Sequence, residues 1–283
     1  MNRRTFLKRT SGFLITIAGM SGGTYYYSKE IEPMTLHIQK EIIHSTKLPE
    51  SFHNKKIIQF SDTHLGFNYT LEELKKLVQE INKLTPDIIV FTGDLIDDPL
   101  ESSEQENEEI VNVLRQLDAS TGKFWVYGNH DHGGYGTDQI LQIMEAADFT
   151  LLQNSHITLD PHLVIAGIDD VMLGKPDLDA ALSQVNPNAL TILLAHEPDF
   201  ADETVKYPLD VQLSGHSHGG QIRFPILGHL YTPLYAHNYV LGKYNIQNKL
   251  KLFVNAGIGT TRVPYRFLCK PEIHEYTLKK DLS

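Results

Sequence analysis

The chain has 283 residues, of which 41% are hydrophobic and 21% charged, and this balance excludes a disordered tail, a collagen-like rod and a polytopic membrane protein. Its 35 acidic residues against 25 basic ones give a formal net charge of -10, so we expect no nucleic-acid-binding surface, which needs clustered Lys and Arg. The single cysteine, Cys269, excludes an intrachain disulfide and a cysteine-based zinc site.

The N-terminal segment, residues 1–30, has the layout of an export signal or signal anchor. Arg3 and Arg4, with two further cations before residue 10, precede an uncharged stretch from Thr10 to Ser28. The paired arginines resemble a twin-arginine motif, which predicts the twin-arginine export machinery as a partner and the cell envelope, cell wall or outer membrane face as the destination. No clear small-residue cleavage site follows, so an ordinary signal anchor and membrane association through the N-terminus stay open.

Residues 50–280 are predicted to form one α/β domain. A helical stripe of apolar residues runs over 71–84, where Thr70 and Glu73 form a capping box, and a second amphipathic stretch lies near 104–117. Short apolar runs bounded by Gly, Asp, Asn or Pro predict strands at Ile57–Phe60, Ile88–Phe91, Phe124–Tyr127, Leu163–Ile168, Leu190–Ala195, Val211–Leu213 and Leu252–Val254. Alternation of strands and helices is typical of the α/β class.

Five of these strands are each followed directly by a polar motif. The motifs are Ser61-Asp62-Thr63-His64, Thr92-Gly93-Asp94, Gly128-Asn129-His130-Asp131, His196-Glu197 and Gly215-His216-Ser217-His218. Taken singly, each is more commonly a turn or a surface histidine, but together they are expected to meet at the edge where α/β sheets bind ligands. The acidic run from Asp97 to Glu109 is interpreted as a solvated loop and helix start, with Asp97 the one position of interest.

The residue types in these motifs predict a pair of metal ions. Asp and His side chains with one Asn oxygen suit Mn, Fe or Zn, and seven residues supply eight contacts if one carboxylate bridges. The seven predicted metal ligands are Asp62, His64, Asp94, Asn129, His196, His216 and His218. Two ions about 3.5–4 Å apart clamp a phosphoryl group for in-line attack by a bridging hydroxide. His130 directly follows a ligand, so we expect it to project toward the substrate, with Asp131 available to hold its ring.

The ordered set D-x-H, G-D, G-N-H-D, H and G-H-x-H resembles the calcineurin-like metallophosphoesterase family. The likeness extends to the exported YkuE-type branch of bacterial phosphoesterases in G-N-H-D-H-G-G-Y-G at 128–136, L-S-G-H-S-H-G-G-Q at 213–221 and R-F-L-C-K-P-E at 266–272. This resemblance implies a four-layer α/β/β/α sandwich, two divalent metal ions per chain (Mn, Zn or Fe) and hydrolysis of phosphoric esters.

The resemblance also assigns roles to individual residues. It implies that Asp94 bridges two metals, which are completed by Asp62, His64 and His218 on one side and by Asn129, His196 and His216 on the other. His130 is implied to be the proton donor or charge stabiliser over the phosphate, oriented by Asp131.

One loop departs from the pattern of the family. Members often carry an arginine soon after the G-N-H motif, where this chain has His132, Gly133 and Gly134. Arg262 and Arg266 are the candidates for the missing phosphate clamp, although either is equally well explained as a structural arginine.

These residues favour hydrolysis of a small or polymeric phosphate ester, with phosphodiesters preferred over monoesters. A second hypothesis is a lipid-directed phosphohydrolase acting on a UDP-diacylglucosamine-like or other membrane or wall phosphodiester, although an exported address argues against a cytoplasmic nucleotide-lipid. A hypothesis of another class is an inactive metal-binding interaction scaffold. Such a scaffold is expected to have lost ligands or His130, and this chain retains them all.

Overall fold

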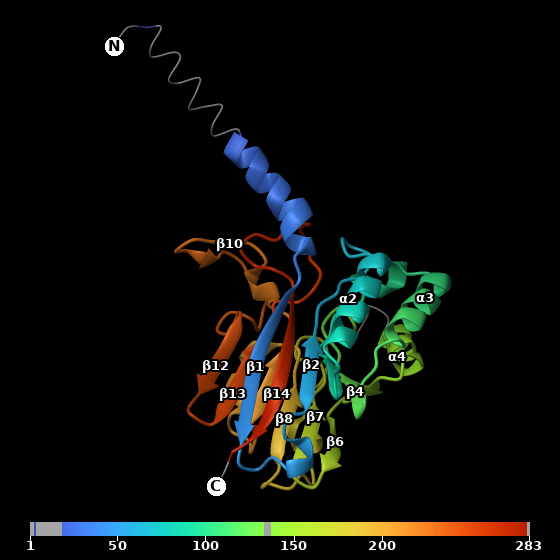
Figure 1. Cartoon of the computed structure of the whole chain (residues 1–283), viewed down its shortest axis with the longest axis vertical. Helices are drawn as coiled ribbons and strands as arrows, with labels where there is room; N and C mark the ends of the chain where they lie inside the picture. Colours follow the sequence, from blue (N-terminus) through green and yellow to red (C-terminus); the bar gives the residue numbers. More distant parts are fainter. Residues whose placement is uncertain (1–2, 4–18, 133–136, 282–283) are drawn as a thin grey trace.

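The computed structural model describes residues 3, 19–132 and 137–281, and two six-stranded sheets form its centre (Figure 1). The first sheet contains, in spatial order, β1 (His37–Ser45), β14 (Glu272–Lys280), β2 (Lys56–Phe60), β3 (Ile88–Phe91), β4 (Gly122–Trp125) and β5 (Thr150–Leu151). The second contains β12 (Gly242–Ile246), β13 (Leu250–Val254), β9 (Val211–Ser214), β8 (Leu190–Leu194), β7 (Leu163–Gly167) and β6 (Ser155–Asp160). A small hairpin pairs β10 (Arg223–Phe224) with β11 (Gly228–His229).

Helices cover the outer faces of both sheets. On the first sheet they are α2 (Leu71–Lys83), α3 (Glu104–Leu114) and α4 (Thr137–Ala146), and on the second the short α5 (Leu178–Ala181) and α6 (Ala201–Thr204). Single-turn helices lie at Tyr27–Ile31, Glu32–Met34, Glu50–Phe52, Pro99–Glu101, Pro198–Phe200 and His218–Gly220. A third buried cluster joins the facing sides of the two sheets. The layers are therefore helix, sheet, sheet and helix, which confirms the predicted α/β/β/α sandwich.

The capping box and the apolar stripe of α2 are present as the sequence predicts. The Thr70 hydroxyl accepts a hydrogen bond from the Glu73 amide at 3.3 Å, and the Glu73 carboxylate accepts one from the Thr70 amide at 2.6 Å. One stripe of the helix, containing Leu74, Val78 and Ile81, is buried against the first sheet. The capping box fixes where the helix begins, and the apolar stripe fixes which face packs.

The N-terminal part of the described chain is integrated into the fold. β1 pairs in parallel with β14, with His37 opposite Glu272, so the sheet begins before residue 50, where the sequence places the start of the domain. Just before β1, the Glu32 carboxylate is buried and accepts hydrogen bonds from the amides of Leu268 and Cys269. Most of the predicted export signal lies outside the described residues. Within the described residues, no helix is long and apolar enough to cross a membrane.

Candidate metal centre

The carboxyl ends of five strands from both sheets bring the predicted ligands together. β2, β3 and β4 are parallel neighbours in one sheet, and β8 and β9 are parallel neighbours in the other. Two buried groups form beyond these ends, each with its ligand atoms within 4.8 Å of one another: Asp62, His64 and His218, and Asp94, His196 and His216. The predicted convergence of histidine and aspartate ligands is therefore present.

Asp94 lies between the two groups. Its Oδ2 is 3.2 Å from His196 Nε2 and 3.5 Å from His64 Nε2, so one carboxylate faces a ligand of each group. His64 Nε2 is also 3.0 Å from His218 Nε2, and His196 Nε2 is 3.1 Å from His216 Nδ1. Pairs of ring nitrogens at such distances are typical of atoms that share a cation. The position of Asp94 matches the bridging role that the family resemblance implies.

The backbone at the ligands is unusual. Asp62, His64, Asp94, His216 and His218 have φ between 44° and 66°, the left-handed region that non-glycine residues rarely adopt. Such a conformation costs about 1–2 kcal/mol per residue and is concentrated at functional sites. The strain turns each side chain sharply at the end of its strand, so that residues two apart reach the same centre.

Glycines allow the loops to approach the carboxylates closely. A Cβ at Gly128 would lie 2.3 Å from Asp94 Oδ1, and a Cβ at Gly215 would lie 2.4 Å from Asp62 Oδ2. Both distances are far below van der Waals contact, so a side chain at either position would displace a predicted ligand. The G-N-H-D and G-H-x-H motifs therefore need their glycines for space around the ligands.

Hydrogen bonds to the second ring nitrogen orient three of the histidines. His64 Nδ1 donates to the Asp97 carboxylate at 2.9 Å, and His196 Nδ1 donates to the Thr92 carbonyl at 2.5 Å. His216 Nε2 donates to the Leu234 carbonyl at 2.8 Å. When such a ring is neutral, its other nitrogen carries the lone pair and faces the shared centre, which is the arrangement that metal-ligating histidines adopt.

The protonation of the histidines differs across the centre. Burial, together with neighbouring His196, lowers the pKa of His216 to about 3, and burial with neighbouring His64 also lowers the pKa of His218. Burial opposes the charged form of His196 as well, but the Asp94 carboxylate overrides it and raises the pKa of His196. Neutral imidazole is the form that binds a metal, so the lowered pKa values of His216 and His218 are compatible with their predicted role as ligands.

Asn129 provides a test of whether metal ions fit this centre. Its Oδ1 is buried and accepts no hydrogen bond from the described residues, although a buried amide oxygen without a partner is costly. Burial, with the neighbouring Asp94 carboxylate, also raises the pKa of the fully buried Asp62, so the negative charge of this carboxylate is not fully offset by its neighbours. A buried amide oxygen without a partner, together with carboxylates and imidazoles, fits divalent cations of the Mn, Fe or Zn type.

The comparison with known families decides the identity. Residues 55–220 match the calcineurin-like phosphoesterase family, and this range contains every predicted metal ligand. The chain belongs to this family. Family members depend on two metals, and the clustered ligands of this chain agree with that requirement.

Individual relatives extend the match over the whole metallophosphoesterase chain. It is 45% identical over 283 residues to the uncharacterized metallophosphoesterase YkuE of Bacillus subtilis, covering 99% of this chain and 98% of that protein. It is 28% identical over 307 residues to the UDP-2,3-diacylglucosamine pyrophosphatase LpxG of Chlamydia muridarum, covering 88% and 91% of the two chains. The crystal structure of a dimetal phosphatase from Danio rerio shares the fold, with a TM-score of 0.54, 11% identity and coverage of 81% and 94%.

The partners of His130 and Asp131 in this metallophosphoesterase differ from those implied by the resemblance. Both oxygens of Asp131 accept hydrogen bonds from backbone amides, those of Asp94, Leu95 and Gly128, at 2.6–3.0 Å. The Nδ1 of His130 instead donates to the carbonyl of Asp97 at 2.6 Å. Asp131 therefore holds the two ligand loops together, and Asp97 fixes the His130 ring. The predicted contact between Asp131 and the ring is not the one that holds this nitrogen.

His130 itself is placed at the edge of the centre. Its amide donates to Asp94 Oδ1 at 2.8 Å, and its ring packs edge-on against His64 with centroids 4.6 Å apart. Burial opposes the charged form, but the Asp94 carboxylate overrides it and raises the pKa of His130. A histidine with a raised pKa beside the ligands, and itself partly exposed, is placed to donate a proton.

The two arginines predicted as phosphate clamps are engaged elsewhere. Arg266 is fully buried, and its guanidinium donates to the carbonyls of Gly259, Ala256, Gly257 and Cys269 at 2.6–3.2 Å, so its clamp role is wrong and its role is structural. The guanidinium of exposed Arg262 lies 4.7 Å from the centre of the Tyr231 ring.

The loop that replaces the family arginine is described only in part. His132 Nε2 lies 2.9 Å from the Asp169 carboxylate and is mostly buried. Gly133 and Gly134 lie outside the described residues. The His132 ring is therefore in contact with the loop that carries Asp169.

Two structural contacts to the ligands had no signal in the sequence. The carbonyls of Thr92 and Leu234 orient His196 and His216. Because every residue has a backbone carbonyl, the residue type gives no sign of such a contact. Asp97, the singled-out member of the acidic run, is in contact with His64.

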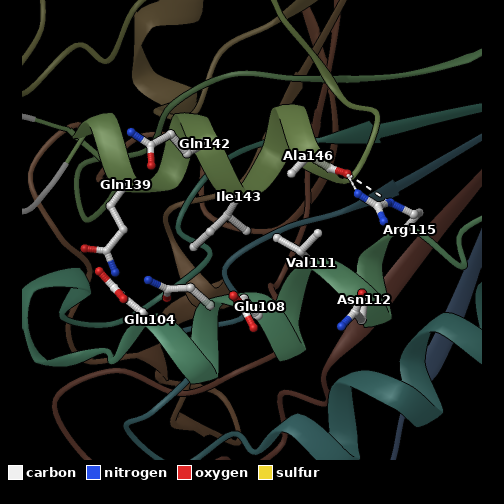
Figure 2. A pocket seen from close by; sticks show the side chains of 10 residues that line it. Glu104, Glu108, Val111, Asn112, Arg115, Gln139, Gln142, Ile143 and Ala146 are labelled. Carbon is white, nitrogen blue, oxygen red and sulfur yellow. Dashed lines mark hydrogen bonds between the residues drawn. The ribbon is translucent and has the colours of Figure 1, made fainter.

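A separate groove lies between α3 and α4 (Figure 2). It has a volume of about 530 Å³ and is lined by side chains such as Glu104, Val111, Gln139 and Ile143, with Arg115 donating to the Ala146 carbonyl at its end. None of the predicted metal ligands lines it. The groove is therefore no part of the metal centre.

Proposed function

We propose that this metallophosphoesterase hydrolyses phosphodiesters with two divalent ions held by the seven predicted ligands. The observation that carries the proposal is the convergence of these ligands around Asp94, with the Asn129 oxygen buried and unpartnered. Preference for diesters is supported by the arginines. A monoester carries up to two negative charges at neutral pH, and neither Arg266 nor Arg262 is directed to the centre to offset the second.

The residues divide the reaction between them. Divalent ions, when bound, supply a Lewis acid and an acidified water near neutral pH. Asp94 holds the two halves of the ligand set in one geometry, and Asp131 fixes the loops that carry Asp94 and Asn129 by accepting three backbone amides. His130, oriented by the Asp97 carbonyl, donates a proton to the departing alkoxide oxygen or stabilises its charge.

Removal of metal tests the proposal directly. Chelation is expected to abolish hydrolysis of bis(p-nitrophenyl) phosphate, because the carboxylates and neutral imidazoles alone offer no strong nucleophile, and Mn or Zn is expected to restore it. Elemental analysis is expected to find two ions per active chain. Undiminished turnover in a preparation shown to be metal-free would refute the dinuclear mechanism. An inert chain that still holds two ions would favour the interaction scaffold.

A lipid phosphoester is the second candidate substrate. It is supported by the similarity to a relative named as a UDP-2,3-diacylglucosamine pyrophosphatase. Hydrolysis of a diacylated phosphodiester or pyrophosphate, compared with its deacylated analogue, distinguishes the two. If both are cleaved with equal kcat/KM, the acyl chains contribute nothing and the lipid-directed hypothesis is wrong.

We also propose export by the twin-arginine pathway to the cell envelope. Support comes from Arg3 and Arg4 ahead of an uncharged stretch. The pathway's receptor is expected to require the guanidinium pair rather than positive charge, since Arg and Lys present different donor geometry. The double variant Arg3→Lys/Arg4→Lys is therefore expected to remain in the cytoplasm, as measured by cell fractionation. Wild-type levels of that variant in the envelope would indicate an ordinary signal or anchor.

A further inference from the structure

About one fifth of the chain has an unusual charge distribution. Residues 211–271 contain no Asp or Glu, although the whole chain carries 35 of them and a net charge of -10. The basic residues in that range are Arg223, Lys243, Lys249, Lys251, Arg262, Lys270 and Arg266, of which Arg266 is fully buried and not available to a partner. Within it, residues 224–242 carry no charged side chain of either sign. This part of an acidic protein is therefore suited to an anionic partner.

The same region exposes a concentration of large apolar side chains. In the described part of the chain, seven exposed large apolar residues lie within 224–235. Five more lie within 20–34 and two within 263–268. Ile226, Leu227 and Leu230 are 106%, 74% and 70% exposed. Single exposed apolar residues are ordinary, but a contiguous group marks an interaction site. We name the group the apolar lip: Phe224, Ile226, Leu227, Leu230, Tyr231, Leu234, Tyr235 and Val263.

Ring contacts join the apolar lip to the N-terminal helical segment. Phe224 packs against Phe267 with ring centroids 6.4 Å apart, and Tyr27 packs against the same Phe267 at 6.4 Å. Tyr25 contacts Tyr265 at 5.6 Å. Figure 1 shows β10 of the lip beside the lower end of the N-terminal helix, at the same end of the molecule. The exposed apolar groups thus form one continuous surface.

The apolar lip is also connected to the loops that carry the metal ligands. The carbonyl of Leu234 accepts the hydrogen bond from His216 Nε2 at 2.8 Å. The guanidinium of Arg223, which begins β10, donates to the carbonyl of Gly219 at 2.7 Å, one residue after His218. Whatever covers the lip therefore lies beside the metal centre.

We propose that the apolar lip docks on an anionic phospholipid bilayer, with its aliphatic tip in the boundary between headgroups and acyl chains. The highly exposed aliphatic residues Ile226, Leu227 and Leu230, the exposed Tyr231 and the arginine that packs on its ring, Arg262, match the chemistry of that boundary. The N-terminal segment leaves the domain beside the lip, and its sequence places four cations before an uncharged stretch. Docking by the lip does not depend on the proposed hydrolysis.

A second copy of the chain is a poorer occupant. A two-fold pairing of the lip with itself would bring Arg223 and Arg262 of one copy toward the same residues of the other, with no acidic residue in 211–271 to pair them. Like charges in contact oppose such pairing, whereas anionic headgroups neutralise them.

A tryptophan reporter tests whether the lip enters the bilayer. The chain has one tryptophan, Trp125, which is fully buried, so a new one on the surface is readily distinguished. Full-length Ile226→Trp is mixed with vesicles of phosphatidylglycerol and phosphatidylcholine in equal amounts. Its emission is expected to shift to shorter wavelength and to be quenched by lipids brominated in the acyl chains. The matched control, Leu100→Trp, replaces a residue that is 67% exposed elsewhere and is expected to show neither effect.

Other outcomes would overturn the docking proposal. The full chain could sediment with vesicles while the emission wavelength of Ile226→Trp stays the same as without vesicles. In that case the N-terminal segment alone binds the protein to the bilayer. If the shift occurs without vesicles and grows with protein concentration, the lip binds a second copy. Equal quenching of Leu100→Trp would show general adsorption rather than docking.

A second variant measures the contribution of the lip. Leu227→Glu/Leu230→Glu in the Ile226→Trp background is expected to weaken vesicle affinity roughly tenfold or more, because two apolar side chains no longer leave water. Its thermal melting and its hydrolysis of a soluble diester are expected to match the parent, which shows that the fold is intact. Unchanged vesicle affinity contradicts the proposal. If the parent hydrolyses no ester but docks, the proposed function fails and the docking surface stands.

Discussion

His130→Ala is expected to lower the turnover of a phosphodiester with an alkyl leaving group by about 10²–10⁴ while leaving both metal ions bound. The His130 ring is held by the Asp97 carbonyl at 2.6 Å and belongs to the edge of the ligand set, whereas the amide oxygen of Asn129 is buried without a hydrogen-bond partner and is the predicted ligand. The loss of turnover in His130→Ala is therefore expected to come from lost proton donation or charge stabilisation rather than from lost metal. Initial rates together with metal analysis of the purified variant measure both quantities.

The dependence on leaving group separates this role from a structural one. A nitrophenolate departs without a proton, so its hydrolysis is expected to fall less than that of the alkyl ester in His130→Ala. His196→Ala, the control within the centre, is expected to lower metal occupancy for every substrate, since His196 Nε2 faces Asp94 at 3.2 Å. Loss of an ion from His130→Ala, with both ions retained by His196→Ala, would reverse the two assignments.

The order of motifs along the chain was sufficient to predict that the histidines and aspartates converge, because that convergence depends on side chains at strand ends. Each predicted strand that precedes a motif is present, and the ligands follow the carboxyl ends of parallel neighbours, where geometry alone brings them together. The sequence could not show how much backbone strain the ligands bear. Five of them adopt left-handed φ, which is a property of the folded loops rather than of residue type.

Two residues with expected roles at the site make contacts with main-chain atoms that the sequence does not reveal. Arg266 was a candidate for phosphate binding, but backbone carbonyls from residues 256 to 269 surround its guanidinium. Asp131 was expected to be available to hold the His130 ring, and its two oxygens accept three backbone amides. A side chain that binds the backbone and one that binds a substrate can be the same residue type, so the sequence alone does not distinguish them.

Strand β14 was missed because its burial is polar. It carries Glu272, His274 and Tyr276, which are buried in a network rather than in an apolar run. His274 contacts Glu272 at 2.8 Å and Tyr276 at 2.7 Å, and the Tyr276 hydroxyl donates to Gln59 of β2 at 2.7 Å. The periodicity of apolar residues identifies strands that bury apolar side chains. A strand that buries hydrogen-bonded polar side chains lacks this pattern and is therefore missed.

Asp94→Asn is expected to disable both halves of the metal centre at once. Asparagine keeps the shape of the side chain and an Oδ1 that accepts the His130 amide, now 2.8 Å away. It replaces the charged Oδ2, which faces His64 and His196, with an amide group that cannot bridge two cations. We expect the metal content to fall below one ion per chain and the diesterase rate to fall by about 10³ or more, since both ions are needed to hold the phosphoryl group.

The design of this test uses a matched carboxylate far from the ligands. Asp87→Asn removes the same charge at the amino end of β3, where the carboxylate accepts hydrogen bonds from Lys55 and the Lys56 amide. It is expected to lower the free energy of unfolding without changing the metal content of the folded chain. His218→Ala should lose chiefly the ion shared with Asp62 and His64. If Asp94→Asn lost no more metal than His218→Ala, Asp94 would belong to one ion alone, and the two halves of the centre would be held independently.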